Sequence, residues 1–231
     1  MVSLDTSAII VCGGKSSRMN GVNKILMPLG DTLVIGKCML AFEKCSSIKE
    51  IIIVCQDKDI EIIRSEAQKL NISKLTGFAS GGETRQQSVI NGLKKISGNT
   101  ELIAVHDGAR PLVKPRHIEK TIKDASVFGG AVLGVPVKDT IKVVSDSIVI
   151  DTPCRSALYI TQTPQVFKKK IYFEGVDFAL EHDLDFTDDC QLAEAVGTKI
   201  YMTAGDYTNI KITTPEDIKI AALLLEEQKC E

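Results

Sequence analysis

The 231-residue sequence lacks several features that mark common classes of protein. Its 28 basic and 30 acidic residues leave a net charge of −2, so there is no basic excess of the kind that binds nucleic acid. The longest apolar runs, such as 51–55, have the length of a strand and are far too short to cross a bilayer. The first seven residues carry no basic segment of a signal peptide. We therefore expect no nucleic-acid partner and no membrane association.

The cysteines and histidines also lack the spacing of metal or disulfide frameworks. The seven cysteines are odd in number, include no C-x-x-C pair, and several lie in apolar runs. We therefore expect buried, reduced cysteine thiols and a protein of the reducing cytoplasm. His106, His117 and His182 are scattered along the chain, so no zinc site is expected.

Two familiar phosphate-binding motifs are absent as well. The stretch Gly14-Lys15-Ser16 resembles the end of a Walker A loop, but the glycine required five positions before Gly14 is replaced by Ile9. The glycines at 13, 14 and 21 do not have the spacing of a dinucleotide-binding fingerprint. Neither a Walker-type NTPase nor a classical dinucleotide enzyme is therefore indicated.

What the chain does have is a glycine-rich loop directly after its first apolar run. Residues 8–12 lead into Gly13-Gly14, and Arg18 and Lys24 follow. Glycine backbone can approach a phosphate closely and turn N–H groups toward it, and two cations can neutralise a triphosphate. We interpret the loop as a phosphate-binding site, with a plain strand-to-helix turn as the alternative.

Alternating apolar runs and helical patterns predict an α/β fold with a mostly parallel, Rossmann-like sheet covered by helices on both faces. The chain is expected to form one domain over 1–231, with an extended β-ribbon arm at about 139–165 that packs on a partner subunit. Strands are expected at 7–12, 50–55, 74–79, 102–106, 131–136, 199–203 and 208–213, and helices at 32–45, 58–70, 84–97, 115–127, 168–182, 188–196 and 215–228.

Two further motifs follow predicted strands. The segment 81–88 opens a helix with two glycines and places Arg85 and Ser88 on one helical face. The segment 105–111 contains Asp107 and Arg110 at the carboxyl end of a strand, where ligands bind in open α/β sheets. The alternative for the segment 81–88 is an ordinary helix start, and the alternative for Asp107 and Arg110 is a surface ion pair.

Taken in order, the motifs resemble one family over about residues 7–228. They are G-G-x-S-x-R-M…N-K, G-G-x-x-R-x-x-S, V-H-D-G-A-R-P, V-P-V-K-D-T, R-x₇-T-P-Q, T-D-D and N-I-K-x-T-T-P-x-D. This order is similar to that of 2-C-methyl-D-erythritol 4-phosphate cytidylyltransferases of the non-mevalonate isoprenoid pathway. The resemblance implies transfer of CMP from CTP to 2-C-methyl-D-erythritol 4-phosphate with release of pyrophosphate. It also implies a homodimer built through the arm and a requirement for Mg²⁺ or another divalent cation.

The resemblance also implies roles for individual residues. Nucleotide binding is implied for Cys12, Gly13, Gly14, Arg18, Lys24, Gly82, Glu83, Arg85 and Ser88. Binding of the methylerythritol phosphate is implied for Asp107, Arg110, Thr140, Arg155, Thr163, Thr187 and Lys211. Cys12 departs from the family pattern, since many members have alanine at this position.

The chemistry of the implied reaction suggests how five of these residues contribute. The nucleophile is a phosphate oxygen that is already anionic, so no general base is required and the difficulty is electrostatic. Arg18 and Lys24 are expected to stabilise the transition state and the leaving pyrophosphate. Arg155 and Lys211 are expected to hold the nucleophile in line, and Asp107 is the candidate metal ligand.

Other functions remain open at this stage. A cytidylyltransferase for another polyol phosphate, such as ribitol 5-phosphate, would share the CTP loops but tends to carry Ser and Val where this chain has Gly108 and Ala109. A sugar 1-phosphate nucleotidyltransferase is more distant. A non-catalytic nucleotide-sensing module could use the same fold, although the presence of Arg18 and Lys24 favours catalysis.

Overall fold

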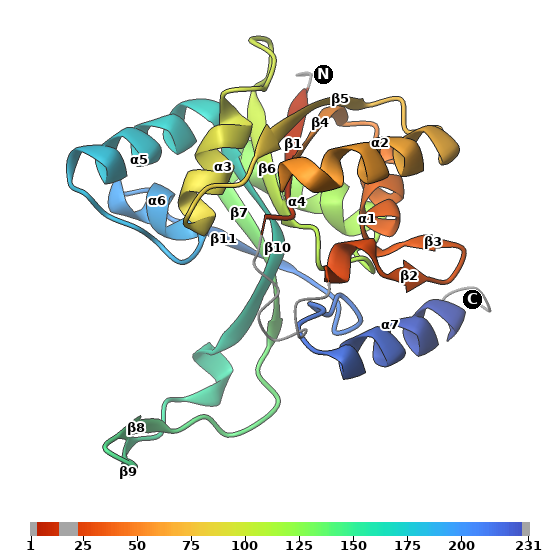
Figure 1. Cartoon of the computed structure of the whole chain (residues 1–231). Coiled ribbons are helices and arrows are strands. Elements are labelled where there is room, and N and C mark those ends of the chain that lie inside the picture. The colour runs from red at the N-terminus through yellow and green to blue at the C-terminus, as the bar shows by residue number, and fades with distance from the viewer. Residues whose placement is uncertain (1–3, 14–22, 228–231) are drawn as a thin grey trace.

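A seven-stranded sheet forms the centre of the protein (Figure 1). The computed structural model describes residues 4–13 and 23–227. The strand order is β11-β7-β10-β6-β1-β4-β5, and β10 is antiparallel to both neighbours while the other pairings are parallel. The bounds are β1 Thr6–Val11, β4 Ile48–Cys55, β5 Leu75–Ser80, β6 Leu102–Asp107, β7 Gly130–Pro136, β10 Tyr159–Lys168 and β11 Tyr201–Ala204.

Helices cover both faces of this sheet because the central strands are apolar on both sides. On β1, Ala8 and Ile10 belong to one buried cluster and Ile9 to the other. The first cluster packs under α1 (Val34–Glu43), α2 (Ile60–Lys69) and α4 (Pro115–Phe128). The second packs under α3 (Arg85–Leu93), α5 (Lys169–Glu181) and α6 (Asp189–Ala195). The predicted mostly parallel sheet between two helical layers is confirmed.

Smaller elements surround the sheet. The last helix, α7 (Pro215–Glu227), packs on a third apolar cluster beside the short strands β2 (Pro28–Leu29) and β3 (Thr32–Leu33). Two 3₁₀ helices, η2 (Lys24–Leu26) and η3 (Asp57–Asp59), lie between the larger elements. Within the described ranges, no helix is both long and apolar enough to cross a membrane.

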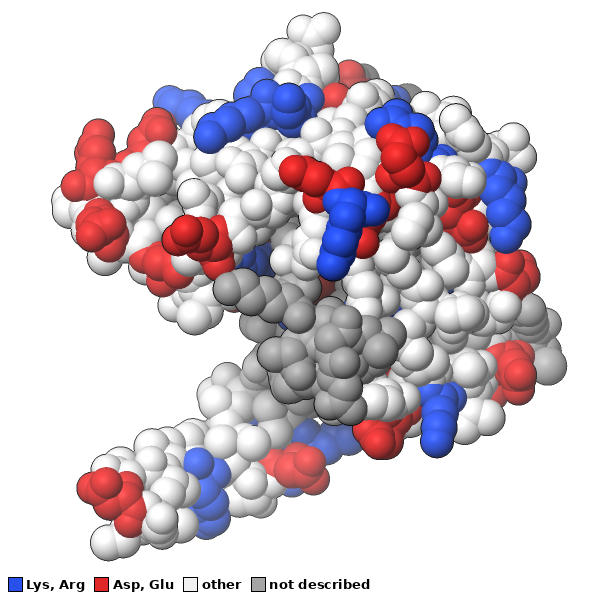
Figure 2. All heavy atoms as spheres, viewed as in Figure 1, with Lys and Arg blue, Asp and Glu red and all other residues white. Residues whose placement is uncertain are grey.

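The segment after β7 leaves the body of the protein as an arm. Its tip is a hairpin of β8 (Val143–Ser145) and β9 (Ile148–Asp151), followed by η4 (Arg155–Ala157), and it stands apart from the sheet (Figures 1 and 2). Asp146 and Ser147 form its turn with positive φ angles of 48° and 65°, as tight hairpin turns require. Ile148 and Ile150 are more than 60% exposed, which is unusual for large apolar side chains on a two-stranded hairpin.

The sequence-based expectations were incomplete in one place and wrong in another. The ribbon was expected to span 139–165, but its returning strand β10 continues to Lys168 and enters the central sheet between β7 and β6. The strand expected at 208–213 is absent. Local bonds compete with strand pairing there, because Thr208 N–H bonds the Asp206 carboxylate at 3.0 Å and Asn209 N–H bonds the Asp206 carbonyl at 3.0 Å.

Candidate functional site

The two glycine segments meet at the carboxyl edge of the sheet. Gly13 follows β1, Gly81 follows β5, and a Cβ atom built on Gly13 would lie 3.3 Å from the Gly81 Cα. This is tighter than most Cβ contacts, so the absence of a side chain on Gly13 favours the close approach of the two main chains. Cys12 is buried just before this contact, and its N–H bonds the Val54 carbonyl at 2.7 Å. Gly14 and Arg18, which the sequence assigned to the phosphate loop, lie outside the described residues.

Lys24 begins η2 directly after an anchored cap. The Asn23 side chain donates to the buried Asp59 carboxylate at 2.7 Å and accepts from Ile25 N–H at 3.4 Å. The first turn of η2, which carries Lys24, is therefore tied to η3 by a charge-assisted hydrogen bond.

The segment implied to bind cytidine is held by its own side chains. The Ser88 hydroxyl accepts from Gly82 N–H at 2.9 Å and donates to the Thr84 carbonyl at 2.9 Å. Glu83 N–H bonds the Gln87 side chain at 2.8 Å, and the Glu83 carboxylate is exposed to solvent. The single hydroxyl proton of Ser88 is thus used to shape the loop, while Gly82 and Glu83 stay at the surface.

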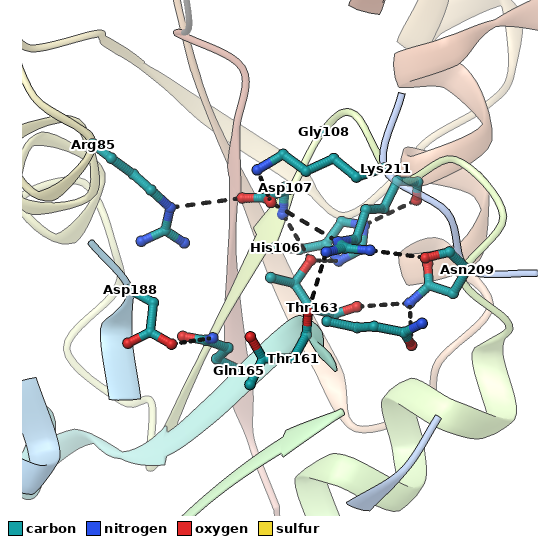
Figure 3. Close-up of polar contacts among 12 residues, drawn as sticks. Arg85, His106, Asp107, Gly108, Thr161, Thr163, Gln165, Asp188, Asn209 and Lys211 are labelled. Carbon is teal, nitrogen blue, oxygen red and sulfur yellow. Dashed lines mark hydrogen bonds and ion pairs between the residues drawn. The ribbon is translucent and has the colours of Figure 1, made fainter. Parts of the chain in front are cut away.

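Arg85 does not point toward this loop. Its guanidinium lies 2.6 Å from a carboxylate oxygen of buried Asp189. It also lies 3.7 Å from Asp107 (Figure 3). Asp189 also accepts a hydrogen bond from the Tyr172 hydroxyl at 2.5 Å. Burial opposes the charge on Arg85, but Asp189 and Asp107 outweigh it and raise the pKa of Arg85 above its usual range.

Asp107 lies at the centre of three cations. Its carboxylate is 2.7 Å from Lys211 Nζ, 3.7 Å from Arg85 and 3.9 Å from Arg110. Burial alone would raise the pKa of Asp107, but Lys211 and Arg85 outweigh it and lower the pKa to about 2. Asp107 therefore stays ionised at every physiological pH and holds the cations around it.

Arg110 is fixed by main-chain acceptors. Its guanidinium donates to the Asn209 carbonyl at 2.9 Å and to the Thr161 carbonyl at 3.4 Å. Its buried Nε has no hydrogen-bond partner among the described residues. Burial lowers the pKa of Arg110, which gains from any additional anion in the site.

These groups line a cavity of about 520 Å³. Asp107, Arg110, Thr163, Thr187 and Lys211 of the implied acceptor residues all lie on its wall, together with Arg85. The Thr187 hydroxyl donates to Gln191 at 3.0 Å. A cavity of this size with a few convergent polar groups is typical of a small-molecule site.

The other two implied acceptor residues lie elsewhere. Thr140 and Arg155 are both on the exposed arm, and Arg155 donates to the Lys138 carbonyl at 3.0 Å. Neither is among the residues that line the cavity of the same chain. The structure thus brings five of the seven implied acceptor residues together and leaves the two arm residues apart.

The surroundings of Asp107 do not fit a protein-held metal ion. Mg²⁺ prefers several oxygen ligands, and the described residues contain no group of three or more His, Cys, Asp or Glu placed to hold a metal. Asp107 is a single carboxylate already paired with Lys211 and flanked by two arginines. The assignment of Asp107 as a metal ligand is disfavoured by these three positive charges.

Sequence reasoning gave no role to several residues that shape this site. Asn209 is fully buried and donates to the Gln162 side chain at 3.3 Å and the Thr163 carbonyl at 3.1 Å. Gln165 accepts from Asp189 N–H at 2.9 Å and donates to Asp188 at 3.3 Å. These residues lie inside the motifs quoted above. An amide side chain in an otherwise apolar or helix-capping stretch could have indicated their structural role.

Gly108, next to Asp107, and Cys12, next to Gly13, form a closely packed pair. A Cβ on Gly108 would lie 2.3 Å from Cys12 Sγ and 3.3 Å from the Val11 carbonyl oxygen. We expect Gly108→Ala to lower the free energy of unfolding by about 1–3 kcal/mol through overpacking. Adding Cys12→Ala should restore most of this loss, because it removes the sulfur. Denaturant unfolding of both variants checks this, and equal destabilisation of single and double variants would contradict it.

His106 makes stability depend on pH. Burial lowers its pKa to about 4, against an ordinary value of 6.5. Between these values the unfolded chain binds a proton that the folded chain does not, so stability falls as the pH decreases through this window. We expect His106 to account for a loss of about 3 kcal/mol in unfolding free energy between pH 7 and 4. Unfolding at several pH values should show a smaller slope for His106→Gln; identical slopes would refute the assignment.

Comparison with known proteins connects this geometry to one family. Residues 6–227 match the family model of 2-C-methyl-D-erythritol 4-phosphate cytidylyltransferase. A relative of that name from Caldanaerobacter subterraneus subsp. tengcongensis is 42% identical over 227 residues, covering 97% of this chain and all of the relative. A second from Clostridium botulinum is 39% identical over 223 residues, covering 96% and 97%.

Solved structures give the same result. A 4-diphosphocytidyl-2C-methyl-D-erythritol synthase from Anaerococcus prevotii is similar with a TM-score of 0.86 and 32% identity, covering 96% of each chain. A 2-C-methyl-D-erythritol 4-phosphate cytidylyltransferase from Thermus thermophilus gives a TM-score of 0.77 with 26% identity, covering 95% of this chain and 98% of the other.

Proposed function

Because the chain belongs to the 2-C-methyl-D-erythritol 4-phosphate cytidylyltransferase family, we propose that its reaction takes place at the carboxyl edge of the sheet, where the glycine segments meet the Asp107 cluster. The enzyme transfers CMP from CTP to 2-C-methyl-D-erythritol 4-phosphate and releases pyrophosphate, a step of non-mevalonate isoprenoid biosynthesis. This location is supported above all by one observation: Lys211 and Arg110 converge on Asp107 in the 520 Å³ cavity.

The acceptor phosphate supplies the nucleophile. One of its anionic oxygens forms a bond to the α-phosphorus of CTP, while the bond from that phosphorus to the oxygen bridging to the β-phosphate breaks. Pyrophosphate leaves with the electron pair of that bond. No proton has to be removed from the nucleophile, in keeping with a site whose buried histidine, His106, is already bonded to Thr163 and to the Arg110 carbonyl.

Catalysis then depends on positioning and charge. We assign Lys24 and Arg18 to the triphosphate and the leaving pyrophosphate, and Gly13, Gly14 and Cys12 to nucleotide binding. Lys211 faces the acceptor phosphate, held at 2.7 Å by Asp107. The Asp107 carboxylate also supplies an acceptor for hydroxyl groups of the polyol. A preorganised cation avoids reorganisation as charge develops, which is the main source of such rate enhancement.

We assign the divalent cation to the nucleotide rather than to a protein cage. Mg²⁺ would enter on the phosphates of CTP and neutralise part of their charge, in line with its preference for phosphate and water oxygens. The crowding of Asp107 by three cations supports this assignment. We place the reaction in the cytoplasm, the reducing compartment that suits the reduced thiols expected from the cysteine pattern.

A homodimer would complete the site. Thr140 and Arg155 lie on the arm, away from the cavity of their own chain, and the exposed apolar hairpin at the arm's tip requires a covering surface. In our proposal the arm of one chain reaches over its partner, and Arg155 binds the acceptor phosphate in the partner's cavity. Each site would then combine one body with the other chain's arm.

Mixing inactive variants tests this arrangement. Arg155→Ala chains keep an intact body and Lys211→Ala chains keep an intact arm, so half of randomly reassociated dimers should contain one complete site. Dissociated and reassociated mixtures should recover roughly a quarter of wild-type turnover. The matched control mixes Arg155→Ala with Thr140→Ala, two arm variants, which should recover nothing above their mean. A lack of recovery in the first mixture would place both residues in the site of one chain.

A further inference from the structure

The histidine of the V-H-D-G-A-R-P motif was given no role by the sequence, yet it makes two of the site's best-defined bonds. His106 is fully buried and its ring packs against that of Phe42, with centroids 4.9 Å apart. Its Nδ1 lies 2.9 Å from the Thr163 hydroxyl and its Nε2 lies 3.2 Å from the Arg110 carbonyl oxygen. The imidazole thus joins β10 to the turn that carries Asp107 and Arg110 (Figure 3).

The partners fix the direction of every bond in this chain. A carbonyl oxygen only accepts, so Nε2 carries the ring proton and Nδ1 is the acceptor. The Thr163 hydroxyl must then donate its proton to Nδ1. Its oxygen accepts from Asp107 N–H at 3.0 Å. The sequence of donors runs from the Asp107 main chain through Thr163 and His106 to the Arg110 main chain, and each bond is satisfied.

This arrangement changes what Thr163 can do. A hydroxyl has one proton, and here that proton is committed to His106, so Thr163 has none to donate to an acceptor phosphate. The Thr163 side chain is also 4% exposed, although it borders the cavity. Both described hydrogen bonds of the Thr163 hydroxyl, to His106 Nδ1 and from Asp107 N–H, are therefore made within the protein.

We propose that His106, in its neutral Nε2–H form, and Thr163 are positioning residues that set the main chain of Asp107 and Arg110 for acceptor binding. The proposal rests on the proposed function of the Asp107 cluster. Both ends of the network lie on the short turn from Asp107 to Arg110, which is closed by Arg110 N–H on the Asp107 carbonyl at 2.9 Å. Burial lowers the pKa of His106 to about 4, which keeps the ring neutral at physiological pH.

The first test is independent of activity. Long-range ¹H–¹⁵N correlation spectra of the ¹⁵N-histidine-labelled wild-type protein at pH 7 should show one histidine locked as the Nε2–H tautomer, assigned by its loss in His106→Gln. An Nδ1–H tautomer, a tautomeric mixture or an imidazolium at His106 would overturn the proposal, whatever substrate the enzyme uses.

The second test separates positioning from direct contact. Thr163→Val removes the hydroxyl and should raise the KM for 2-C-methyl-D-erythritol 4-phosphate roughly tenfold, with the KM for CTP unchanged within about twofold. Thr163→Ser should recover most of that loss, because it retains the hydroxyl. His106→Leu should produce a similar increase, and the Thr163→Val/His106→Leu pair should be no worse than either single variant.

Additive losses in the double variant, or an effect of Thr163→Val with none of His106→Leu, would show that Thr163 contacts the substrate directly and overturn the proposal. An equal change in the KM for CTP would show a general structural effect and also overturn it. If the wild-type enzyme used a different acceptor, the proposed function would fail while the tautomer measurement still tested this inference.

Discussion

Replacing Lys24 with alanine should lower kcat by about 10²-fold or more while the protein remains folded. Lys24 stands at the start of η2, which Asn23 ties to the buried Asp59 carboxylate, so the cation is held on an anchored turn. Loss of one preorganised group that stabilises transition-state charge typically costs 10²–10³ in rate. Steady-state pyrophosphate release measures the effect.

Lys49→Ala is a suitable control for Lys24→Ala. Lys49 is an exposed lysine near the amino end of β4, whereas the site lies at the carboxyl edge of the sheet. It should leave kcat unchanged. A folded Lys24→Ala enzyme with a near-normal kcat would remove Lys24 from the proposed mechanism.

The second large effect is expected for Lys211→Ala. Its ammonium is 2.7 Å from Asp107, and in the proposed mechanism it also binds the acceptor phosphate. Truncating one partner of a close charge pair at a binding site costs about 2–5 kcal/mol, so kcat/KM for the acceptor should fall about 30-fold or more. The KM for CTP should change little, because the proposed mechanism assigns Lys211 to the acceptor phosphate and not to CTP.

Removing Lys211 also leaves Asp107 with one cation fewer, so the pKa of Asp107 should rise from about 2. The exposed Lys219 on α7 provides the control, and Lys219→Ala should behave as wild type. Equal losses for CTP and the acceptor in Lys211→Ala would contradict the assignment of Lys211 to the acceptor phosphate.

Much of the fold followed from sequence periodicity alone. The buried strands β1, β4 and β6 each contain a continuous apolar run, and α4 begins at Pro115, a residue suited to the first turn of a helix. The insertion of β10 as an antiparallel strand could not be inferred, because a returning ribbon and a sheet strand share the same alternation. Only the hydrogen-bonded pairing of β10 with the distant strands β6 and β7 distinguishes a sheet strand from a free ribbon.

The site followed from the sequence only in part. The family resemblance grouped Asp107, Arg110 and Lys211, and the fold brings them together from segments about a hundred residues apart. The alternating charges that join Arg85 to Asp107 and Asp189 were not predictable, since strand and helix patterns do not specify which side chains meet across the cavity. The same holds for the His106–Thr163 network, which depends on the position of β10.

The most direct test of this account is pyrophosphate release by the purified enzyme with CTP and Mg²⁺, comparing 2-C-methyl-D-erythritol 4-phosphate with ribitol 5-phosphate. We predict turnover with the first acceptor and none above background with the second, consistent with the Gly108-Ala109 pair beside Asp107. Turnover with ribitol 5-phosphate instead would contradict the acceptor assignment, and silence with both in a folded protein that binds CTP would contradict the catalytic role itself.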